Sequence, residues 1–461
     1  MSALWTSAEA EAATLGRASR AFEATGLSID TRTLKPGDLF VALKGEARDG
    51  HEFVGAALKA KAAAALVSRA VDADGALLTV ANTQRGLEDL GRAARTRSHA
   101  RIVAVTGSAG KTTTKEMLRL AFGALGKTHA SSAYYNNHWG VPLSLAAKPR
   151  DEQFGNFEIG MNHFGEIRGL VGFVRPHVAL ITTIAPAHLE FFSSCEAIAD
   201  AKSEIFEGLV PGGTGIVPAD SPYAGRLIAR ARQANVSRLL TFGAQAGSDA
   251  RLVSTAPQDD GMKVEGEVMG RPVSFRIGAP GAHIAQNAMA ALLAVAAAEG
   301  DVLNAAAALE SFAALKGRGA RFRIKLNGGD AEVIDESYNA NPASMSAAFA
   351  LLGASQPGKG GRRIAAIGDM LEMGEGGAAH HAAIAKDAEA ARVDLVFANG
   401  NAMKALWDAL PQSRRGAYAK TSAEIAPQLS QTVHAGDVVL VKGSLGSRMS
   451  VVIDALKARA G

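Results

Sequence analysis

Residues 102–113 read Ile-Val-Ala-Val-Thr-Gly-Ser-Ala-Gly-Lys-Thr-Thr, an apolar run followed by a glycine turn, a lysine and threonines. The apolar run predicts a strand, and the lysine and threonines predict the start of a helix. In such a turn, backbone N–H groups face an anion, the lysine adds positive charge, and a threonine hydroxyl can reach Mg²⁺. The stretch therefore predicts binding of nucleotide phosphates by Thr106, Gly107, Ser108, Ala109, Gly110, Lys111, Thr112 and Thr113.

The spacing of the glycines makes this a shortened phosphate loop. The common pattern puts four residues between its glycines, whereas only Ser108 and Ala109 separate Gly107 from Gly110. Val105 stands where the common pattern has its first glycine. Because the shortened form is less common than the general pattern, it limits which families of ATP- or GTP-using proteins the chain can belong to.

Length and composition bound the class of protein. A chain of 461 residues suggests about three domains, and 48% hydrophobic with 20% charged residues is ordinary for globular cores. The net charge of +4 is too small to indicate nucleic-acid binding. Cys195 is the only cysteine, so no disulfide can form within the chain. No apolar run is long enough to span a bilayer. Because the N-terminus also lacks the pattern of a signal peptide, we expect a cytoplasmic protein without membrane insertion.

Strand and helix patterns alternate along the chain and divide it into three segments, residues 1–98, 99–317 and 318–461. In the first segment, strands are expected at Ser28–Arg32, Asp38–Leu43 and Ala64–Val67, and a helix at Phe53–Lys61. In the second, strands are expected at 102–105, Phe157–Ile159, Val178–Thr182 and Gly215–Val217, and helices at Thr112–Leu125 and Cys195–Glu207. Gly317–Gly319 has the composition of a hinge. In the third, strands are expected at Ala331–Asp335, Arg363–Ile367, Leu395–Ala398 and Val438–Val441, and helices at Pro342–Leu352, Ala378–Ala391 and Ser447–Ala460. This alternation predicts α/β domains with mostly parallel sheets.

Three polar residues follow the phosphate loop at positions where ligands bind in such sheets. Glu158 ends an expected strand, His188 follows another, and Lys202 lies on an expected helix. Each has an ordinary structural explanation when taken alone, because strand-end carboxylates and helical lysines are common. Their order after a nucleotide loop makes them candidates for catalysis and for binding a metal ion beside the phosphates.

The motifs taken together resemble the Mur ligase family of cell-wall enzymes over essentially the whole chain. In the central segment the resemblance is carried by residues 106–113, Asn136-Asn137 with 140–142, 158–163 with 165–167, 187–190, 201–206, and His283 with Gln286-Asn287. In the last segment it is carried by 335–342, 368–370 with Glu372 and Gly374, and 442–444. It implies a small UDP-binding N-terminal domain, a central ATPase-type domain and a Rossmann-like C-terminal domain.

The resemblance also implies ATP-dependent formation of an amide bond through an acyl phosphate, with two Mg²⁺ ions. Lys111 would stabilise the β- and γ-phosphates, and Thr112 with Glu158 would hold the Mg²⁺ between them. His188 would be a ligand of the second Mg²⁺. Lys202 would be carbamylated by CO₂ and would thereby supply oxygen donors to the metal site.

The same resemblance implies that further residues bind the nucleotide and the substrate. Asn287 would contact adenine, and Arg321 and Asp335 would approach the phosphate and ribose from the C-terminal domain, with Arg318 as the alternative to Arg321. The residues expected at the substrate are Ser28, Asp30, Thr31 and Arg32 for the UDP moiety, together with Asn136, Asn137, Asn339 and Asn341.

The run Asp335–Pro342 resembles the branch of the family that joins D-alanyl-D-alanine to a UDP-N-acetylmuramoyl (UDP-MurNAc) tripeptide. We expect a monomer, because nothing in the sequence demands more. Whether the third residue of the tripeptide is meso-diaminopimelate or lysine stays open. A sibling ligase, either one that adds the third residue or a folate-polyglutamate type, is the nearest alternative. A nucleotide-driven switch is the alternative from a different class, and Glu158, His188 and Lys202 argue against it because a switch needs no second metal site.

Overall fold

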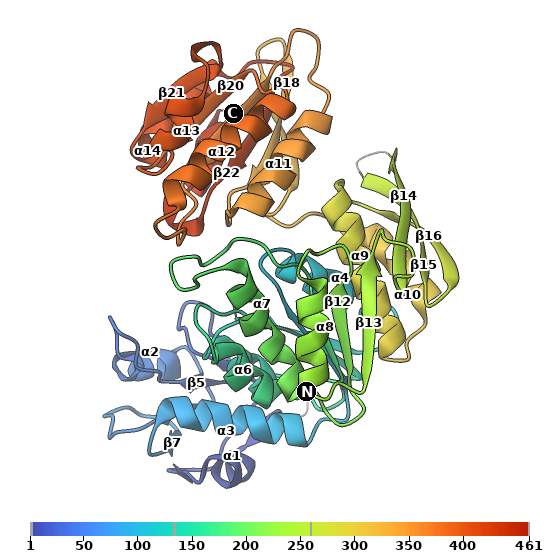
Figure 1. Ribbon diagram of the computed structural model, residues 1–461. Coiled ribbons are helices and arrows are strands. Elements are labelled where there is room, and N and C mark those ends of the chain that lie inside the picture. The colour runs from blue at the N-terminus through green and yellow to red at the C-terminus, as the bar shows by residue number, and fades with distance from the viewer. Residues whose placement is uncertain (1–2, 132–134, 259–260, 460–461) are drawn as a thin grey trace.

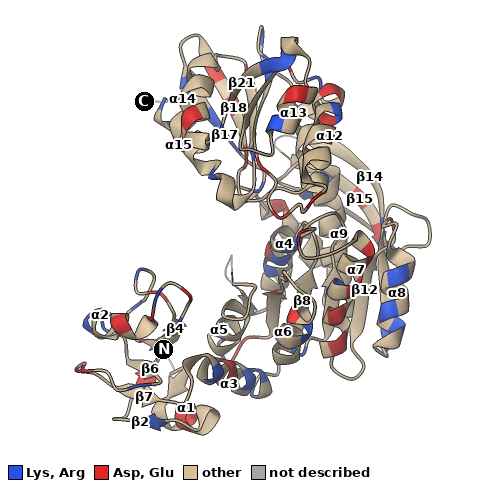
Figure 2. Cartoon of the chain, turned by 60° about the vertical axis from the view of Figure 1, so that its left-hand side comes forward, with Lys and Arg blue, Asp and Glu red and all other residues tan. Residues whose placement is uncertain are grey.

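The computed structural model describes residues 3–131, 135–258 and 261–459 and contains one large sheet in each of the three predicted segments (Figure 1). Figures 1 and 2 show the N-terminal and C-terminal domains at different ends of the central domain. The exact boundaries between the domains stay predictions. The three α/β domains and the mostly parallel sheets are confirmed.

The N-terminal domain has a five-stranded sheet in the order β2-β7-β6-β5-β4 and a small two-stranded sheet of β1 and β3. Its elements are β1 (Trp5–Thr6), α1 (Ser7–Thr14), β2 (Arg17–Ala18), β3 (Glu23–Ala24), β4 (Gly26–Ser28), β5 (Asp38–Val41), a 3₁₀ turn (Gly50–Phe53), α2 (Val54–Lys59), β6 (Ala64–Val67), β7 (Leu77–Thr79) and α3 (Thr83–Thr96). The strand expected at Ser28–Arg32 is instead β4 followed by a turn. The Asp30 carboxylate accepts the Arg32 backbone N–H at 2.9 Å, and this local bond favours a turn over a strand.

The central domain has a nine-stranded sheet in the order β16-β15-β14-β13-β12-β11-β8-β10-β9. Its elements are β8 (Arg101–Thr106), α4 (Lys111–Gly123), β9 (Thr128–Ala130), α5 (Gly140–Ala146), β10 (Phe154–Glu158), α6 (Glu166–Val174), β11 (Val178–Ile181), α7 (Cys195–Ser203), a 3₁₀ turn (Glu204–Gly208), β12 (Thr214–Pro218), α8 (Ala224–Gln233), β13 (Arg238–Gly243), β14 (Ala250–Gln258), β15 (Gly261–Val268), β16 (Arg271–Ile277), α9 (Ala282–Ala297), α10 (Val302–Ala308) and a 3₁₀ turn (Leu309–Ser311).

Strand β8 lies between β11 and β10 and is parallel to both, so the phosphate loop that follows it lies at the carboxyl edge of the sheet. None of the expected strands falls in the antiparallel extension β14-β15-β16. Most of β14 is exposed, which removes the alternation of apolar and polar residues by which strands are recognised, whereas β15 alternates between buried and exposed positions and carries that signal.

The C-terminal domain has a six-stranded sheet in the order β17-β18-β22-β19-β20-β21, and only the β17–β18 pair is antiparallel. Its elements are β17 (Ala320–Leu326), β18 (Gly329–Glu336), α11 (Pro342–Ala354), β19 (Arg363–Gly368), α12 (Gly377–Ala390), β20 (Leu395–Asn399), α13 (Lys404–Ala409), a 3₁₀ turn (Gln412–Arg414), β21 (Arg415–Ala419), α14 (Ser422–Thr432), β22 (Val438–Lys442), a 3₁₀ turn (Leu445–Ser447) and α15 (Ser450–Ala458). The expected strands and helices of this segment are confirmed within a few residues, and Ala460, the expected end of the last helix, lies outside the described residues.

The N-terminal domain packs against the central domain through α3 and α5. Leu143 and Ala146 of α5 belong to the same apolar cluster as Trp5 and Leu90 of the N-terminal segment. The buried Arg95 guanidinium donates to the backbone carbonyls of Val174 and Arg175 at 2.7 Å. Arg95 of α3 therefore joins the N-terminal domain to the central domain.

Candidate active site

The phosphate loop connects β8 to α4 and is held by close contacts that require its glycines. Gly110 has φ +81°, and a Cβ there would lie 2.9 Å from Oδ1 of Asn287 on α9. A Cβ at Gly107 would lie 1.9 Å from Oγ1 of Thr182. The Thr182 hydroxyl donates to the Ala109 carbonyl at 2.5 Å and so joins the loop to the end of β11. Backbone conformation and space both exclude larger residues here.

Lys111 and Glu158 place opposite charges beside the loop. The Lys111 ammonium donates to the Gly107 carbonyl at 2.7 Å. Burial lowers the pKa of Lys111, the Glu158 carboxylate opposes that shift, and the positive charge of Arg318 adds to it. Arg318 of the C-terminal domain is therefore close enough to act electrostatically on the phosphate-loop lysine.

Glu158 is a buried carboxylate that accepts hydrogen bonds on both oxygens. The Thr112 hydroxyl donates to Oε2 at 2.8 Å, and the Asn136 amide donates to Oε1 at 2.9 Å. One carboxylate and one hydroxyl suit Mg²⁺, which uses hard oxygen donors and usually keeps water and phosphate oxygens among its ligands. Among the residues that the structure describes, no group of three or more His, Cys, Asp or Glu could hold a metal ion by itself. The donor set fits a cation bound together with a nucleotide and does not fit a cage made of protein alone.

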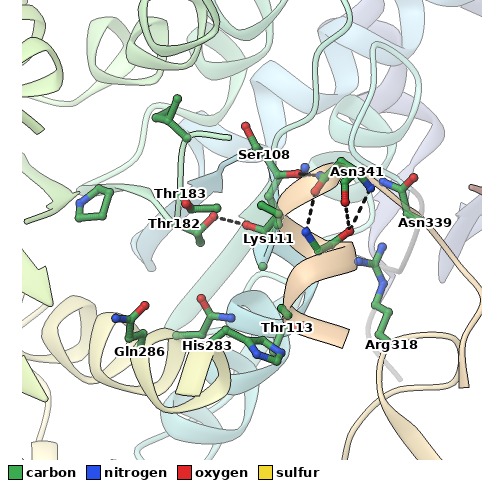
Figure 3. Close-up of a pocket in the computed structure, with 18 of the residues that line it drawn as sticks. Ser108, Lys111, Thr113, Thr182, Thr183, His283, Gln286, Arg318, Asn339 and Asn341 are labelled. Atoms are coloured by element: carbon green, nitrogen blue, oxygen red, sulfur yellow. Dashed lines mark hydrogen bonds between the residues drawn. The ribbon is translucent and has the colours of Figure 1, made fainter. Parts of the chain in front are cut away.

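A cavity of about 520 Å³ lies beside the loop, between the central and C-terminal domains. Figure 3 shows Lys111 and Thr182 near the loop, His283 and Gln286 reaching in from α9, and Arg318 entering from the side of the C-terminal domain. Asn341 caps α11 and its amide also donates to the Ser108 carbonyl at 3.2 Å, so one residue joins the C-terminal domain to the phosphate loop.

The cavity gathers many of the residues expected from the sequence. Those that line it are Ser108, Ala109, Gly110, Lys111, Thr113, Asn136, Glu158, His188, Asn287, Asn339 and Asn341. Those that do not line it are Ser28, Asp30, Thr31, Arg32, Thr106, Gly107, Thr112, Asn137, Lys202, Arg321 and Asp335. Additional lining residues for which no role was predicted include His283, Glu336, Tyr338 and Lys442.

Arg318 lines the cavity and Arg321 does not. The Arg318 guanidinium lies 4.1 Å from the centre of the Tyr338 ring, and Tyr338 also lines the cavity. Arg321 on β17 instead donates to Glu332 at 2.7 Å and to the Ser355 hydroxyl at 3.2 Å. Arg318 lies before β17, in the turn at Gly317–Gly319, whereas Arg321 lies within the strand. The position of the turn at Gly317 decides which arginine enters the cavity.

Asp335 is buried and supports the turn at the start of the C-terminal domain. Its carboxylate accepts the Gly317 backbone N–H at 3.1 Å and the Ser337 hydroxyl at 2.5 Å. Gly317 and Gly319 have φ values of +75° and +95°, which favour glycine. These contacts explain Asp335 as a support for the turn that presents Arg318.

Lys202 is a buried lysine on α7 with 1% exposure. In the described part of the chain, its ammonium has neither a hydrogen bond nor an ion pair. Burial lowers the pKa of Lys202 well below its usual range, and the nearby charge of Lys111 lowers it further. The amine is thus held in surroundings that disfavour its charged form.

Asn136 and Asn137 lie next to each other but have different surroundings. The Asn137 side chain accepts the backbone N–H of Gly140 at 2.9 Å at the start of α5, whereas Asn136 contacts Glu158. Tyr135 packs against the apolar cluster of the N-terminal domain, and burial and the charge of Asp30 both raise the pKa of Tyr135. Arg32 is exposed and pairs with Asp30. Residues 135 and 136 therefore connect the N-terminal domain to the carboxylate beside the phosphate loop.

A second cavity of about 590 Å³ lies at the carboxyl ends of β19, β20, β21 and β22. Asn399 at the end of β20 is 2% exposed and lines this cavity, and its Oδ1 has no hydrogen-bond partner among the described residues. Asp369, Lys420 and Arg448 line it as well. The sequence predicted no separate function for the residues of this cavity, because they come from four loops that are far apart in the chain.

The glycine loop joins a central parallel strand to a helix and lines a cavity at the carboxyl edge of the sheet. This arrangement is typical of nucleotide-binding proteins of the phosphate-loop class. Three family models match the chain: the Mur ligase family catalytic domain over residues 23–120, the Mur ligase middle domain over 105–295, and the Mur ligase glutamate ligase domain over 320–445. The chain belongs to the Mur ligase family.

Individual relatives match over nearly their full length. The UDP-N-acetylmuramoyl-tripeptide–D-alanyl-D-alanine ligase of Escherichia coli is 35% identical over 94% of this chain and 93% of the relative. The protein of the same name from Rickettsia prowazekii is 30% identical over 93% of this chain and 94% of the relative. MurF from Acinetobacter baumannii has a structure with a TM-score of 0.85 at 30% identity, covering 98% of this chain and 99% of that one. MurF ligase from Thermotoga maritima in complex with ADP shares the fold, with a TM-score of 0.77 at 24% identity, covering 94% and 97%.

Among the helices of the described residues, none is both long and apolar enough to cross a membrane.

Proposed function

We propose that this chain catalyses the ATP-dependent joining of D-alanyl-D-alanine to a UDP-MurNAc-tripeptide, which gives the pentapeptide precursor of peptidoglycan. The observation that carries the proposal is the single cavity in which the phosphate loop and Glu158 of the central domain meet Arg318, Asn339 and Asn341 of the C-terminal domain. The names of the full-length relatives support the choice of substrates.

The chemistry follows from the poor reactivity of a carboxylate toward an amine. A carboxylate oxygen of the tripeptide attacks the γ-phosphorus of ATP, and the bond to the β–γ bridging oxygen breaks, which gives an acyl phosphate and ADP. The dipeptide amine then attacks the acyl carbon, inorganic phosphate leaves, and the amine loses a proton. Lys111, Arg318 and the loop N–H groups neutralise the charge of the transferred phosphoryl group, which is the main demand of this step. Thr112, Glu158 and His188 would hold Mg²⁺, whose charge assists the same neutralisation.

Lys202 is proposed to carry a carbamate. The neutral amine attacks CO₂ and loses a proton, so a buried cation becomes an anion with oxygen donors for Mg²⁺. The lowered pKa of Lys202 supports this reaction, because only the neutral amine is nucleophilic. Protein kept in ¹³C-labelled bicarbonate should give a carbamate carbon resonance that is missing in Lys202→Ala. A spectrum that is the same for both proteins would reject the carbamate.

The tripeptide substrate is proposed to extend from the N-terminal domain to the cavity. Ser28, Asp30, Thr31 and Arg32 would receive the UDP end, and Asn136 would contact the substrate near Glu158. The exposed Arg32 supports this arrangement because a guanidinium matches the geometry of a diphosphate.

The second cavity is proposed to receive the incoming dipeptide. Lys420 and Arg448 would attract its carboxylate. Oδ1 of Asn399, which has no hydrogen-bond partner in the described part of the chain, and the Asp369 carboxylate would accept hydrogen bonds from its amine. The strands that end at the two cavities are neighbours in one sheet, so both cavities lie along the same edge. Asn399→Ala should raise KM for the dipeptide about tenfold and leave KM for ATP unchanged. An unchanged KM for the dipeptide would contradict the assignment.

The proposed function is tested by ATP-dependent phosphate release with detection of the product by mass. Purified protein, Mg²⁺, D-alanyl-D-alanine and either the meso-diaminopimelate or the lysine form of the tripeptide should yield pentapeptide with one of the two forms. Release that requires neither substrate would indicate an ATPase switch, and no release with either form of the tripeptide would indicate a sibling ligase. The cytoplasmic location and the monomeric state expected from the sequence stay predictions.

A further inference from the structure

Two loops from different domains meet at His188 and Glu372. His188 follows β11 of the central domain and lines the main cavity, and Glu372 follows β19 of the C-terminal domain. Nδ1 of His188 lies 2.5 Å from Oε2 of Glu372. Because an ionised carboxylate can only accept, Nδ1 is the donor in this bond.

The backbone of both loops is shaped for this contact. His188 has φ +57° and Glu372 has φ +60°, a left-handed conformation that is unfavourable for residues other than glycine. The Glu190 backbone N–H donates to the Glu372 carbonyl at 3.0 Å. Gly374 has φ +61°, and a Cβ there would lie 2.9 Å from the Leu189 carbonyl. Leu189 packs against the apolar cores of both domains. The two loops therefore form one closely fitted contact.

Stability alone is a weak explanation for this pair. The side chains of His188 and Glu372 are 22% and 40% exposed, and an ion pair as open as this contributes little to folding. Two residues in the left-handed region both add strain, which is typical of positions kept for function. The contact instead has the form of a carboxylate–histidine pair that orients a metal ligand.

We propose that Glu372 is a positioning residue that holds His188 by Nδ1 and leaves Nε2 as the nitrogen available to a divalent cation. This inference rests on the proposed function, in which His188 is a metal ligand. Because Glu372 belongs to the C-terminal domain, docking of that domain on the central domain is what orients the imidazole. The metal site is complete only while the two loops are in contact.

The test measures binding of Mn²⁺, as a substitute for Mg²⁺, in the presence of ADP, from the electron paramagnetic resonance signal of free Mn²⁺. Glu372→Ala should weaken Mn²⁺ binding about tenfold or more, the usual effect of removing such a partner. Glu372→Gln should restore most of the affinity, because its amide oxygen still accepts the Nδ1 proton. Glu375→Ala, at an exposed position of the same loop, is the control and should leave binding unchanged.

A double-mutant cycle separates positioning from a structural role. In a His188→Ala background, Glu372→Ala should have no further effect on Mn²⁺ affinity. An equal loss in both backgrounds, or no loss in the single variant, would overturn the positioning role while His188 keeps its place in the proposed function. If His188→Ala itself leaves Mn²⁺ affinity unchanged, His188 is not a metal ligand, and both that part of the proposed function and the role of Glu372 are wrong.

Discussion

Replacing Arg318 by alanine should weaken the use of ATP, whereas replacing Arg321 should not. Arg318 lines the cavity beside Lys111, and we propose that its guanidinium contacts the phosphates of ATP there. A hydrogen bond to a charged group contributes about 1.5–3 kcal/mol, which corresponds to a loss of about 10- to 150-fold in kcat/KM for ATP. The folded state should change little, because the contact with Tyr338 contributes about 0.5–1 kcal/mol.

Arg321→Ala is the matched variant from the same segment. It removes a partly exposed ion pair with Glu332, which contributes about 1 kcal/mol or less to stability. Pentapeptide formation at varied ATP concentration gives kcat/KM for both variants, and thermal unfolding checks that each is folded. Calorimetric titration with ADP shows whether the loss lies in nucleotide binding. A large loss of ATP use in Arg321→Ala together with normal use in Arg318→Ala would show that Arg321, and not Arg318, contacts the nucleotide.

Three further predictions concern the phosphate loop, the cap of α11 and the dependence of stability on pH. Gly110→Ala should lower kcat/KM for ATP at least tenfold, because its φ of +81° and the nearby Asn287 leave no place for a Cβ. Gly123→Ala, at the end of the helix that follows the loop, should be neutral in the same assay. Asn341→Ala should destabilise the protein by about 1 kcal/mol in thermal unfolding, since Asn341 caps α11, and an unchanged midpoint would contradict the cap. Burial lowers the pKa of His129 from 6.5 to about 4. Between these two pH values the unfolded chain binds more protons than the folded protein. The stability contributed by the neutral ring is therefore lost as the pH falls from 6.5 toward 4. At pH 5 the loss is about 2 kcal/mol, and the unfolding midpoint of His129→Gln should therefore fall less between pH 7 and pH 5 than that of the unchanged protein.

Local patterns in the sequence predicted much of the fold. The strand at Ala64–Val67 was predicted with the observed bounds, and the phosphate loop lies between a strand and a helix as its residues require. These features depend on neighbours in the chain, because apolar runs, glycine turns and helix starts are set by residues a few positions apart. The exposed β14 carries no such local signal and was therefore missed.

The sequence predicts the residues of the site from their chemical types and from the resemblance of the motifs. The contacts between these residues are visible only in the tertiary structure. The choice between Arg318 and Arg321 depends on the turn that Asp335 supports, and the contact of Glu372 with His188 joins residues of different domains. The second cavity is assembled from the ends of four strands. The class of fold, the phosphate loop and the family can be predicted from the amino-acid sequence. Which polar side chains face one another depends on the tertiary structure, because these contacts join distant parts of the chain. Their distances and orientations are set by how the sheets and domains pack.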